Sequence, residues 1–421
     1  MMSSLVPNQR NGEHSEAQTI EGQQYAASVP IENPTFIRYL LINEVSGMKR
    51  RSYLSVLAAL AIVGCSSNDD SPTQSTEDTR LNPESTPPTA SQPSSTPSST
   101  PPSEPELEWS VVAGAKRGNG HHYPAPTILG DTLIVPSGLN DAGIVEGFDI
   151  DTGDRRWSRS FDDSMISDQP CLPTSDSAVV ISTYSGLRAI TEDGEIEWSE
   201  NIRPAGDLLG TSDTIFIPTQ NGVEARDYAG RQKWVWETES PVYSLGHENG
   251  SVYAKSGTSL YSIWEGEVEW EYQTTIEPST PPVARDGLVF IGTENSRIVA
   301  IRTDNPSIEW EQNLENSVAA PITVGQHVYA AGWSYPLKAY NPANGEENWT
   351  FDPSYQTLSA AVEKNGVVYV GNNDYLFARD AGNGKPLWSY SVNSSIWAPP
   401  AVDGNRVYAT TENGGVLCLT V

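Results

Sequence analysis

The sequence predicts an all-β fold, an eight-bladed β-propeller of four-stranded blades, from three observations. A pattern of alternating apolar and polar residues, an Asp/Thr/Gly turn and a final tryptophan, seen at 147–157, recurs along the chain. Successive repeat tryptophans lie 36 to 48 residues apart, the length of one blade. The two ends of the repeat region also complement each other. The repeat tryptophans are Trp109, Trp157, Trp198, Trp234, Trp270, Trp310, Trp349 and Trp388.

The complementary ends predict how the ring closes. The segment 107–112 is a tryptophan strand with no other strands before it. The residues after Trp388 hold three short strands, at 400–403, 406–410 and 416–421, but no tryptophan strand. We expect the N-terminal strand to complete the last blade, because closure then leaves no unpaired sheet edge between the first and last blades.

Residue types divide each repeat into four strands. Small residues and prolines, as in 124–126 and 280–282, are expected on the innermost strand, where the blades crowd together. The pair Asp286-Gly287 supplies the positive φ that a tight hairpin requires, and the β-branched run 288–291 follows as the second strand. The tryptophan of the outermost strand is expected to fill the widening gap between neighbouring blades.

The segment 48–64 is typical of a signal peptide. Basic residues around Arg50 and Arg51 precede an apolar run of eleven residues that is too short to span a bilayer. Residues 1–47 show no helical or strand periodicity, so we expect translation to start at Met48. The arginine pair resembles a twin-arginine export signal, and the residues before Cys65 resemble a lipobox, which implies a lipid anchor on that cysteine.

A low-complexity segment, 65–108, follows the signal peptide. It is dense in Ser, Thr and Pro and carries eight acidic residues against one arginine. With few apolar side chains it cannot offset the entropy lost on ordering, so we expect an extended stalk. This stalk would space the folded region 109–421 from the membrane.

The repeat, A-x-D-x-x-T-G-x-x-x-W in idealised form, resembles the PQQ-type, or quinoprotein-like, β-propeller repeat over residues 109–421. Similar repeats occur in the outer-membrane assembly lipoprotein of Gram-negative bacteria and in quinoprotein alcohol dehydrogenases, so the resemblance implies a fold and not an activity. Those dehydrogenases carry adjacent cysteines beside the cofactor. This chain has no adjacent cysteines and is much shorter, so we expect no bound PQQ.

Two function classes remain open after this resemblance. The first is a non-catalytic, lipid-anchored propeller on the outer face of the cytoplasmic membrane that binds or scaffolds another envelope protein or a ligand. The alternative is a quinoprotein-type oxidoreductase that uses PQQ or another small cofactor at the central funnel. No Ser/His/Asp set, metal cluster or phosphate loop in the sequence supports an enzyme, and we expect a monomer.

The candidate binding patch comes from aligning the blades. Tyr123 directly precedes the inner strand of the first blade, and Trp397 has the same place in the eighth. Ring closure makes these blades neighbours, so we expect His122, Tyr123 and Trp397 to form a recognition surface. Ordinary packing of the connecting loops is the alternative interpretation.

Two motifs could suggest a metal site, but we predict none. The acidic turn at 149–154 has its glycine at the fifth position, where a calcium loop needs it at the sixth. The pair His121-His122 supplies two adjacent ligands, whereas a metal site needs three or four that converge.

The cysteines and the sequons lead to two predictions about covalent bonds made by side chains. Cys171 and Cys418 are expected on blades that are not neighbours, so a disulfide between them is not expected. Sequons at Asn249 and Asn393 permit glycosylation in an exported chain.

The charge of the chain argues against two classes of partner. The net charge is −29, and only 7 of the 25 basic residues are lysine. Such a surface repels nucleic acid and anionic lipid headgroups. Abundant acid with little lysine is typical of proteins adapted to high salt, so we expect a haloarchaeal surface protein that requires salt for stability.

Overall fold

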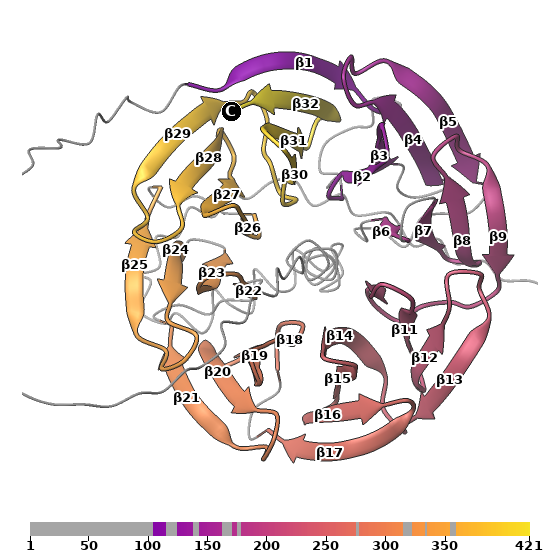
Figure 1. Cartoon of the computed structure of the whole chain (residues 1–421), viewed down its shortest axis with the longest axis vertical. Helices are drawn as coiled ribbons and strands as arrows, with labels where there is room; N and C mark the ends of the chain where they lie inside the picture. The colour runs from indigo at the N-terminus through magenta and orange to yellow at the C-terminus, as the bar shows by residue number, and fades with distance from the viewer. Residues whose placement is uncertain are drawn as a thin grey trace, which may run out of the picture. The chain divides into compact units, whose positions relative to one another are not determined.

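The predicted eight-bladed propeller is confirmed. The computed structural model describes residues 104–114, 124–137, 143–161, 171–174, 178–274, 278–314, 322–332, 335–353 and 359–421. Within these ranges the chain forms 32 strands and no helix, and therefore has no helix that could span a membrane. The strands build eight antiparallel four-stranded sheets arranged in a ring (Figure 1).

The first four blades follow the chain, each from its innermost to its outermost strand. Blade 1 holds β2 (Thr127–Leu129), β3 (Thr132–Ser137), β4 (Gly143–Asp149) and β5 (Arg155–Phe161). Blade 2 holds β6 (Leu172–Pro173), β7 (Ala178–Thr183), β8 (Gly186–Thr191) and β9 (Ile196–Glu200). Blade 3 holds β10 (Leu209–Gly210), β11 (Ile215–Thr219), β12 (Gly222–Arg226) and β13 (Gln232–Glu237). Blade 4 holds β14 (Val242–Glu248), β15 (Ser251–Ser256), β16 (Ser259–Trp264) and β17 (Glu267–Gln273).

The other four blades continue in the same order until the last one. Blade 5 holds β18 (Val283–Arg285), β19 (Leu288–Thr293), β20 (Arg297–Arg302) and β21 (Ile308–Asn313). Blade 6 holds β22 (Ile322–Val324), β23 (Val328–Gly332), β24 (Tyr335–Tyr340) and β25 (Glu347–Phe351). Blade 7 holds β26 (Val362–Lys364), β27 (Val367–Gly371), β28 (Tyr375–Asp380) and β29 (Pro386–Ser391). Blade 8 holds β30 (Ala401–Asp403), β31 (Arg406–Thr410), β32 (Gly415–Thr420) and, outermost, β1 (Glu106–Val112).

Closure of the ring by the N-terminal strand is also confirmed. β1 pairs antiparallel with β32, with Trp109 opposite Cys418. Arg406 of β31 reinforces the closure, because its Nε lies 2.9 Å from Oε2 of Glu108 and its guanidinium also pairs with Asp151 of blade 1. These contacts hold the pKa of the Glu108 carboxyl below its usual value, mainly through a hydrogen bond from Thr420 and also through Arg406. β1 begins at Glu106, within the last residues of the segment expected to be a stalk.

The innermost strands lie later in each repeat than the sequence predicted. The proline-containing segments 124–126 and 280–282 precede β2 and β18 instead of forming them. Proline has no amide proton for the ladder, so the strand begins only after the last proline of each segment. The predicted second strands are correct, since β19 starts at Leu288 and β31 spans Arg406–Thr410.

Each repeat tryptophan lies against the next blade. The Trp109 Nε1 donates to the carbonyl of Ile150 at 3.2 Å, and the indole covers Gly153 of the same turn. Gly153 has φ +74°, and a Cβ there would lie 2.6 Å from the indole. The same arrangement recurs in Trp157 with Gly194, Trp198 with Gly230, Trp234 with Gly266, Trp310 with Gly345 and Trp349 with Gly384.

The hydrophobic core is divided among the interfaces between blades. Eight clusters of buried apolar side chains occur in the described residues, and each combines strands of two neighbouring blades. In the cluster that joins blades 8 and 1, Leu133 and Phe148 pack with Tyr408 and Cys418. Burial of these side chains therefore stabilises the closed ring as well as the individual blades.

Candidate functional site

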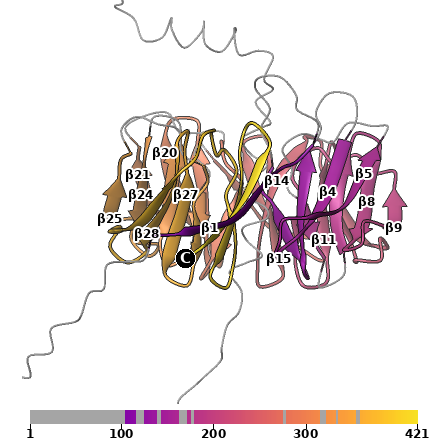
Figure 2. The ribbon, with the colours of Figure 1, turned by 90° about the horizontal axis from the view of Figure 1, so that it is seen from above.

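Antiparallel pairing distributes the turns of each blade between two faces of the ring. Turns between the first and second strands, and between the third and fourth, lie on one face. The connections to the next blade and the turns between second and third strands lie on the opposite face, which we call the connection face. Figure 2 shows the ring from the side, with strands running between the two faces.

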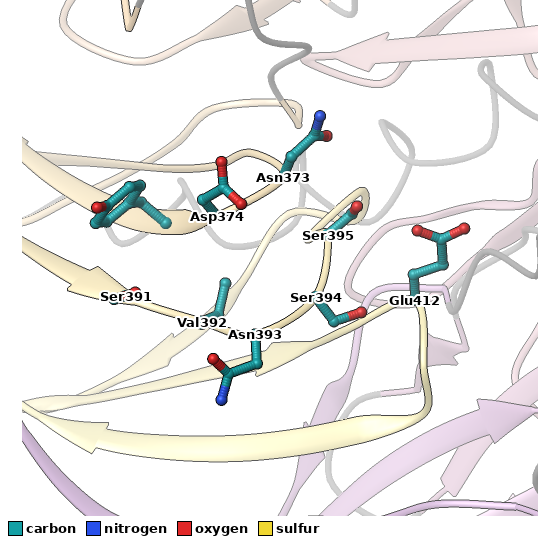
Figure 3. A pocket seen from close by; sticks show the side chains of 9 residues that line it. Asn373, Asp374, Ser391, Val392, Asn393, Ser394, Ser395 and Glu412 are labelled. Carbon is teal, nitrogen blue, oxygen red and sulfur yellow. The ribbon is translucent and has the colours of Figure 1, made fainter.

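A pocket of about 580 Å³ lies on the connection face between blades 7 and 8. Three segments line it: residues 373–375, from the turn after β27 to the start of β28; residues 391–395, from the end of β29 into the connection; and Glu412 in the turn between β31 and β32. Figure 3 shows the labelled side chains on these three segments. We call it the blade 7–8 pocket.

Backbone hydrogen bonds hold the walls of this pocket together. The Val392 amide donates to the Asp374 carbonyl at 2.7 Å, joining the connection to the turn of blade 7. The Glu412 amide donates to the Ser395 carbonyl at 2.8 Å, joining the same connection to the turn of blade 8. The connection is therefore fixed on both sides, and the pocket exists without a ligand to order it.

Asn372 fixes the turn between β27 and β28 through hydrogen bonds to its backbone. Its Oδ1 accepts from the amides of Asp374 at 2.9 Å and Tyr375 at 2.7 Å, and its carbonyl accepts from Ile396 at 2.8 Å. Asparagine is suited to this role because its side chain bonds to nearby backbone amides. The buried Asn372 thus presents Asn373, Asp374 and Tyr375, all exposed, at the pocket rim.

The lining is polar and holds no positive charge. The nine described lining residues are Asn373, Asp374, Tyr375, Ser391, Val392, Asn393, Ser394, Ser395 and Glu412. They provide two carboxylates, two carboxamides, three serine hydroxyls, one phenol and one apolar side chain, and no lysine or arginine. This composition disfavours phosphates and other anions.

Tyr375 borders the pocket, and its ring lies on the side of blade 7 that faces blade 6. Its side chain is 40% exposed. Its ring centroid lies 5.6 Å from that of Phe377, which packs edge-on against Phe351 at 5.0 Å. On Phe351 the Arg379 guanidinium lies 3.4 Å from the ring centroid. These aromatic contacts therefore join blade 7 to blade 6 and do not belong to the interface between blades 7 and 8.

The structure describes one member of the predicted patch. Trp397 lies on the connection face, in the same connection that lines the blade 7–8 pocket, and is partly buried. It does not line the pocket itself. His122 and Tyr123 lie outside the described residues. The sequence predicted the connection that carries Trp397 but not Asn373–Tyr375 or Glu412. The polar turn after β27 could have indicated these residues, because antiparallel pairing brings that turn to the connection face.

In the acidic turn after β4, backbone amides of the turn itself donate to the Asp149 carboxylate. Asp149 accepts from the amides of Asp151 and Thr152, and its other oxygen pairs with Arg156 at 2.7 Å. The hydrogen bond from Arg156 and those from the turn lower the Asp149 pKa to about 2. This carboxylate shapes the turn. Among the described residues no group of three or more His, Cys, Asp or Glu side chains could hold a metal ion.

The two described cysteines are free and buried. Burial raises the pKa of Cys171, which directly precedes β6, and of Cys418 in β32 to about 12 each. Thiols with such values stay protonated and are poor nucleophiles at neutral pH. Cys65, with the export arginines Arg50 and Arg51, lies outside the described residues.

The two sequon asparagines are exposed on opposite faces. Asn249 occupies the turn between β14 and β15 with φ +50°. Asn393 lines the blade 7–8 pocket.

A protein-family model described as outer membrane protein assembly factor BamB matches this chain at residues 104–237, 141–335 and 334–421. The matches together span all eight blades. The chain belongs to this family. The match supports the PQQ-type propeller that the repeat predicted.

One relative in this family is the outer membrane protein assembly factor BamB of Yersinia pestis. It is 22% identical over 356 residues, an alignment that covers 74% of this chain and 88% of the relative. The similarity therefore extends over about three quarters of this chain and most of the relative's length.

Two solved structures illustrate how widely the fold occurs. BamB from Moraxella catarrhalis superposes with a TM-score of 0.57 and 17% identity, covering 75% of this chain and 100% of that one. Quinohemoprotein alcohol dehydrogenase ADHIIG from Pseudomonas putida HK5 gives a TM-score of 0.56 and 13% identity, covering 75% and 76%. At such identities the superpositions show a common fold, which serves different functions.

Proposed function

We propose that the chain is a non-catalytic scaffold that holds another cell-envelope protein. The observation that carries this proposal is the family match across all eight blades, because the relatives are named as assembly factors. From that name we take only the role of holding a partner protein.

The roles that we propose for the N-terminal segments come from the sequence. Arg50 and Arg51 would direct export, Cys65 would carry the lipid, and 65–108 would act as the stalk. This arrangement would anchor the propeller on the outer face of the cytoplasmic membrane. The acidic surface, adapted to a salt-rich exterior, is consistent with a haloarchaeal source.

The proposed partner surface is the connection face around Trp397. Connections between blades are less constrained by strand pairing than the blades themselves and can carry binding residues on a rigid scaffold. Trp397 lies in such a connection, and its ring is partly buried, as expected of an aromatic anchor. His122 and Tyr123 belong to the proposal through their place in the sequence.

Catalysis with bound PQQ is less well supported. The dehydrogenase resemblance is one of fold, and the adjacent cysteine pair associated with those enzymes has no counterpart here. Cys171 and Cys418 are both buried and lie in different blades. We therefore propose no cofactor.

Site-specific crosslinking tests the scaffold proposal. A photoreactive phenylalanine replaces Trp397 in the full chain, expressed in its native cells. We expect irradiation to yield one discrete adduct with an envelope protein, because the connection face carries the partner. The matched control places the same group at Val268, 43% exposed on the outermost strand β17, where no adduct is expected.

Two results would contradict this proposal. One is the absence of a discrete adduct at 397, or equal adducts at 397 and 268. The other is a quinone that co-purifies with the native protein and is reduced by an alcohol, which would establish the oxidoreductase.

A further inference from the structure

We propose that Asn249 carries an N-linked glycan whose first sugar packs on the indole of Trp264. The inference rests on the export that is part of the proposed function, because sequons are modified in exported chains. Two observations carry it. The Asn249-Gly250-Ser251 sequon forms the tip of the hairpin β14–β15, and an exposed indole lies against that tip.

The tip of this hairpin presents the acceptor asparagine to solvent. Asn249 and Gly250 are both exposed, with φ +50° and +93°. Glu248 pairs with Ser251 and closes the two-residue turn between them. Asparagine followed by glycine is well suited to such a turn, in which both residues have positive φ. The acceptor is therefore held at the edge of a blade, where an enzyme can approach it.

The packing of the repeat does not explain Trp264. It is the last residue of β16, a position at which β4 and β28 end in Asp149 and Asp380. Those aspartates accept hydrogen bonds from amides of the turns that follow them. The indole of Trp264 is 45% exposed and lies over Gly250, where an added Cβ would be 2.3 Å from Cζ3. Since adjacent Cα atoms are about 3.8 Å apart, the indole lies beside Asn249.

An indole at this place can pack against a sugar linked to the asparagine. One face of a pyranose ring carries C–H groups, which pack on an aromatic surface, while its hydroxyl groups stay in water. This contact removes exposed apolar surface of Trp264 from water. The turn β14–β15 lies on the face opposite the connection face, so the glycan leaves the proposed partner surface free.

The proposed donor is a glycan linked through its C1 atom to a lipid phosphate. Nδ2 of Asn249 bonds to C1, and the bond from C1 to the phosphate oxygen breaks. The electron pair of that bond leaves with the lipid phosphate, which takes up the proton that Nδ2 loses. The Ser251 hydroxyl completes the sequon; in the folded chain it donates to Oε2 of Glu269 at 2.7 Å.

Mass spectrometry of the mature protein from its native cells tests the modification. We expect a glycan on Asn249, and we expect Ser251→Ala to abolish it because the sequon is lost. An unmodified Asn249 in the natural chain would overturn the inference. Protease treatment of intact cells shows whether the proposed function fails with it, because an exported chain is cleaved and a chain inside the cell is protected.

Thermal melting tests the contact with Trp264. Each chain is compared with its glycan and without it, the second form coming from cells that lack the glycosyltransferase. The direct effect of a substitution then cancels. We expect the glycan to raise the melting temperature of the natural chain by about 2 °C, and that of Trp264→Ala by less than half as much.

The turn between β26 and β27 provides a matched control. Asn365 and Gly366 have φ +54° and +76° and lie on the same face of the ring, but nothing lies within 4 Å of a Cβ added at Gly366. Val367→Thr completes a sequon there, and Ser251→Ala removes the natural one. A glycan on Asn365 should leave the melting temperature unchanged. Equal stabilisation at both turns, or in Trp264→Ala and the natural chain, would overturn the packing on the indole.

Discussion

At the scale of single residues, the tryptophan and glycine of the repeat form one contact between blades. Trp109 of blade 8 covers Gly153 of blade 1, and its Nε1 caps a carbonyl of the same turn. Glycine is required there for two reasons, the positive φ and the absence of a Cβ under the indole. The recurrence of this contact at six of the eight repeat tryptophans therefore reflects one packing requirement.

Gly153→Ala tests this account. We expect it to lower the free energy of unfolding by about 2–5 kcal/mol, since alanine at positive φ costs about 1–2 kcal/mol and overpacking adds about 1–3 kcal/mol. Denaturant titration followed by tryptophan fluorescence measures the change.

Gly366→Ala is the matched control for that substitution. Gly366 has φ +76°, close to the +74° of Gly153, but nothing lies within 4 Å of a Cβ added there. Its alanine variant should lose only about 1–2 kcal/mol. Equal losses for the two variants would mean that the indole contact contributes nothing.

At the scale of elements, β1 is the strand that closes the ring. It covers the edge of β32 and brings Trp109, which is 8% exposed, into the cluster shared by blades 8 and 1. Arg406 ties it to both blades through Glu108 and Asp151. Without β1, the β32 edge would be open to pairing with another chain.

A chain that starts at residue 113 tests the role of β1. We expect a loss of at least about 3–5 kcal/mol, the cost of removing one buried tryptophan, together with self-association through β32. Thermal melting and light scattering after gel filtration measure the two effects.

The control chain starts at residue 104 and keeps β1 whole. It should melt like the complete mature protein and remain monomeric. A chain from residue 113 that behaved like this control would show that seven complete blades and one three-stranded blade suffice for a closed ring.

At the scale of the whole molecule, charge sets the conditions for folding. The chain has 54 acidic and 25 basic residues. Salt shortens the distance over which these charges repel, from about 10 Å at 0.1 M to about 3 Å at 1 M. The compact ring, which concentrates the charges, gains more from this screening than the unfolded chain.

We therefore expect the melting temperature to fall when sodium chloride is lowered from 1 M to 0.1 M. Scanning calorimetry measures it. Replacing the exposed Glu197 and Glu267 with glutamine should make the fall smaller, because it removes two repelling charges. A melting temperature that stays constant or rises at low salt would contradict the expected adaptation to high salt.

Much of the ring could be predicted from the sequence, because the repeat is local. The turn at 149–153, the second strands and the tryptophan strands depend on neighbouring residues, so blade number and closure followed from their pattern. The inner strands start a few residues later than predicted, because proline cannot donate to the ladder and pairing begins only after the last proline of each segment.

The candidate site depended on contacts that the repeat does not encode. Asn373–Tyr375, the connection 391–395 and Glu412 come from three segments of two blades, and only their folding side by side forms a pocket. The Arg406–Asp151 pair likewise joins residues 255 positions apart. The sequence by itself determined the fold, because blades repeat a local pattern; the tertiary structure decided where a ligand could bind, because non-repeating side chains meet only across a blade interface.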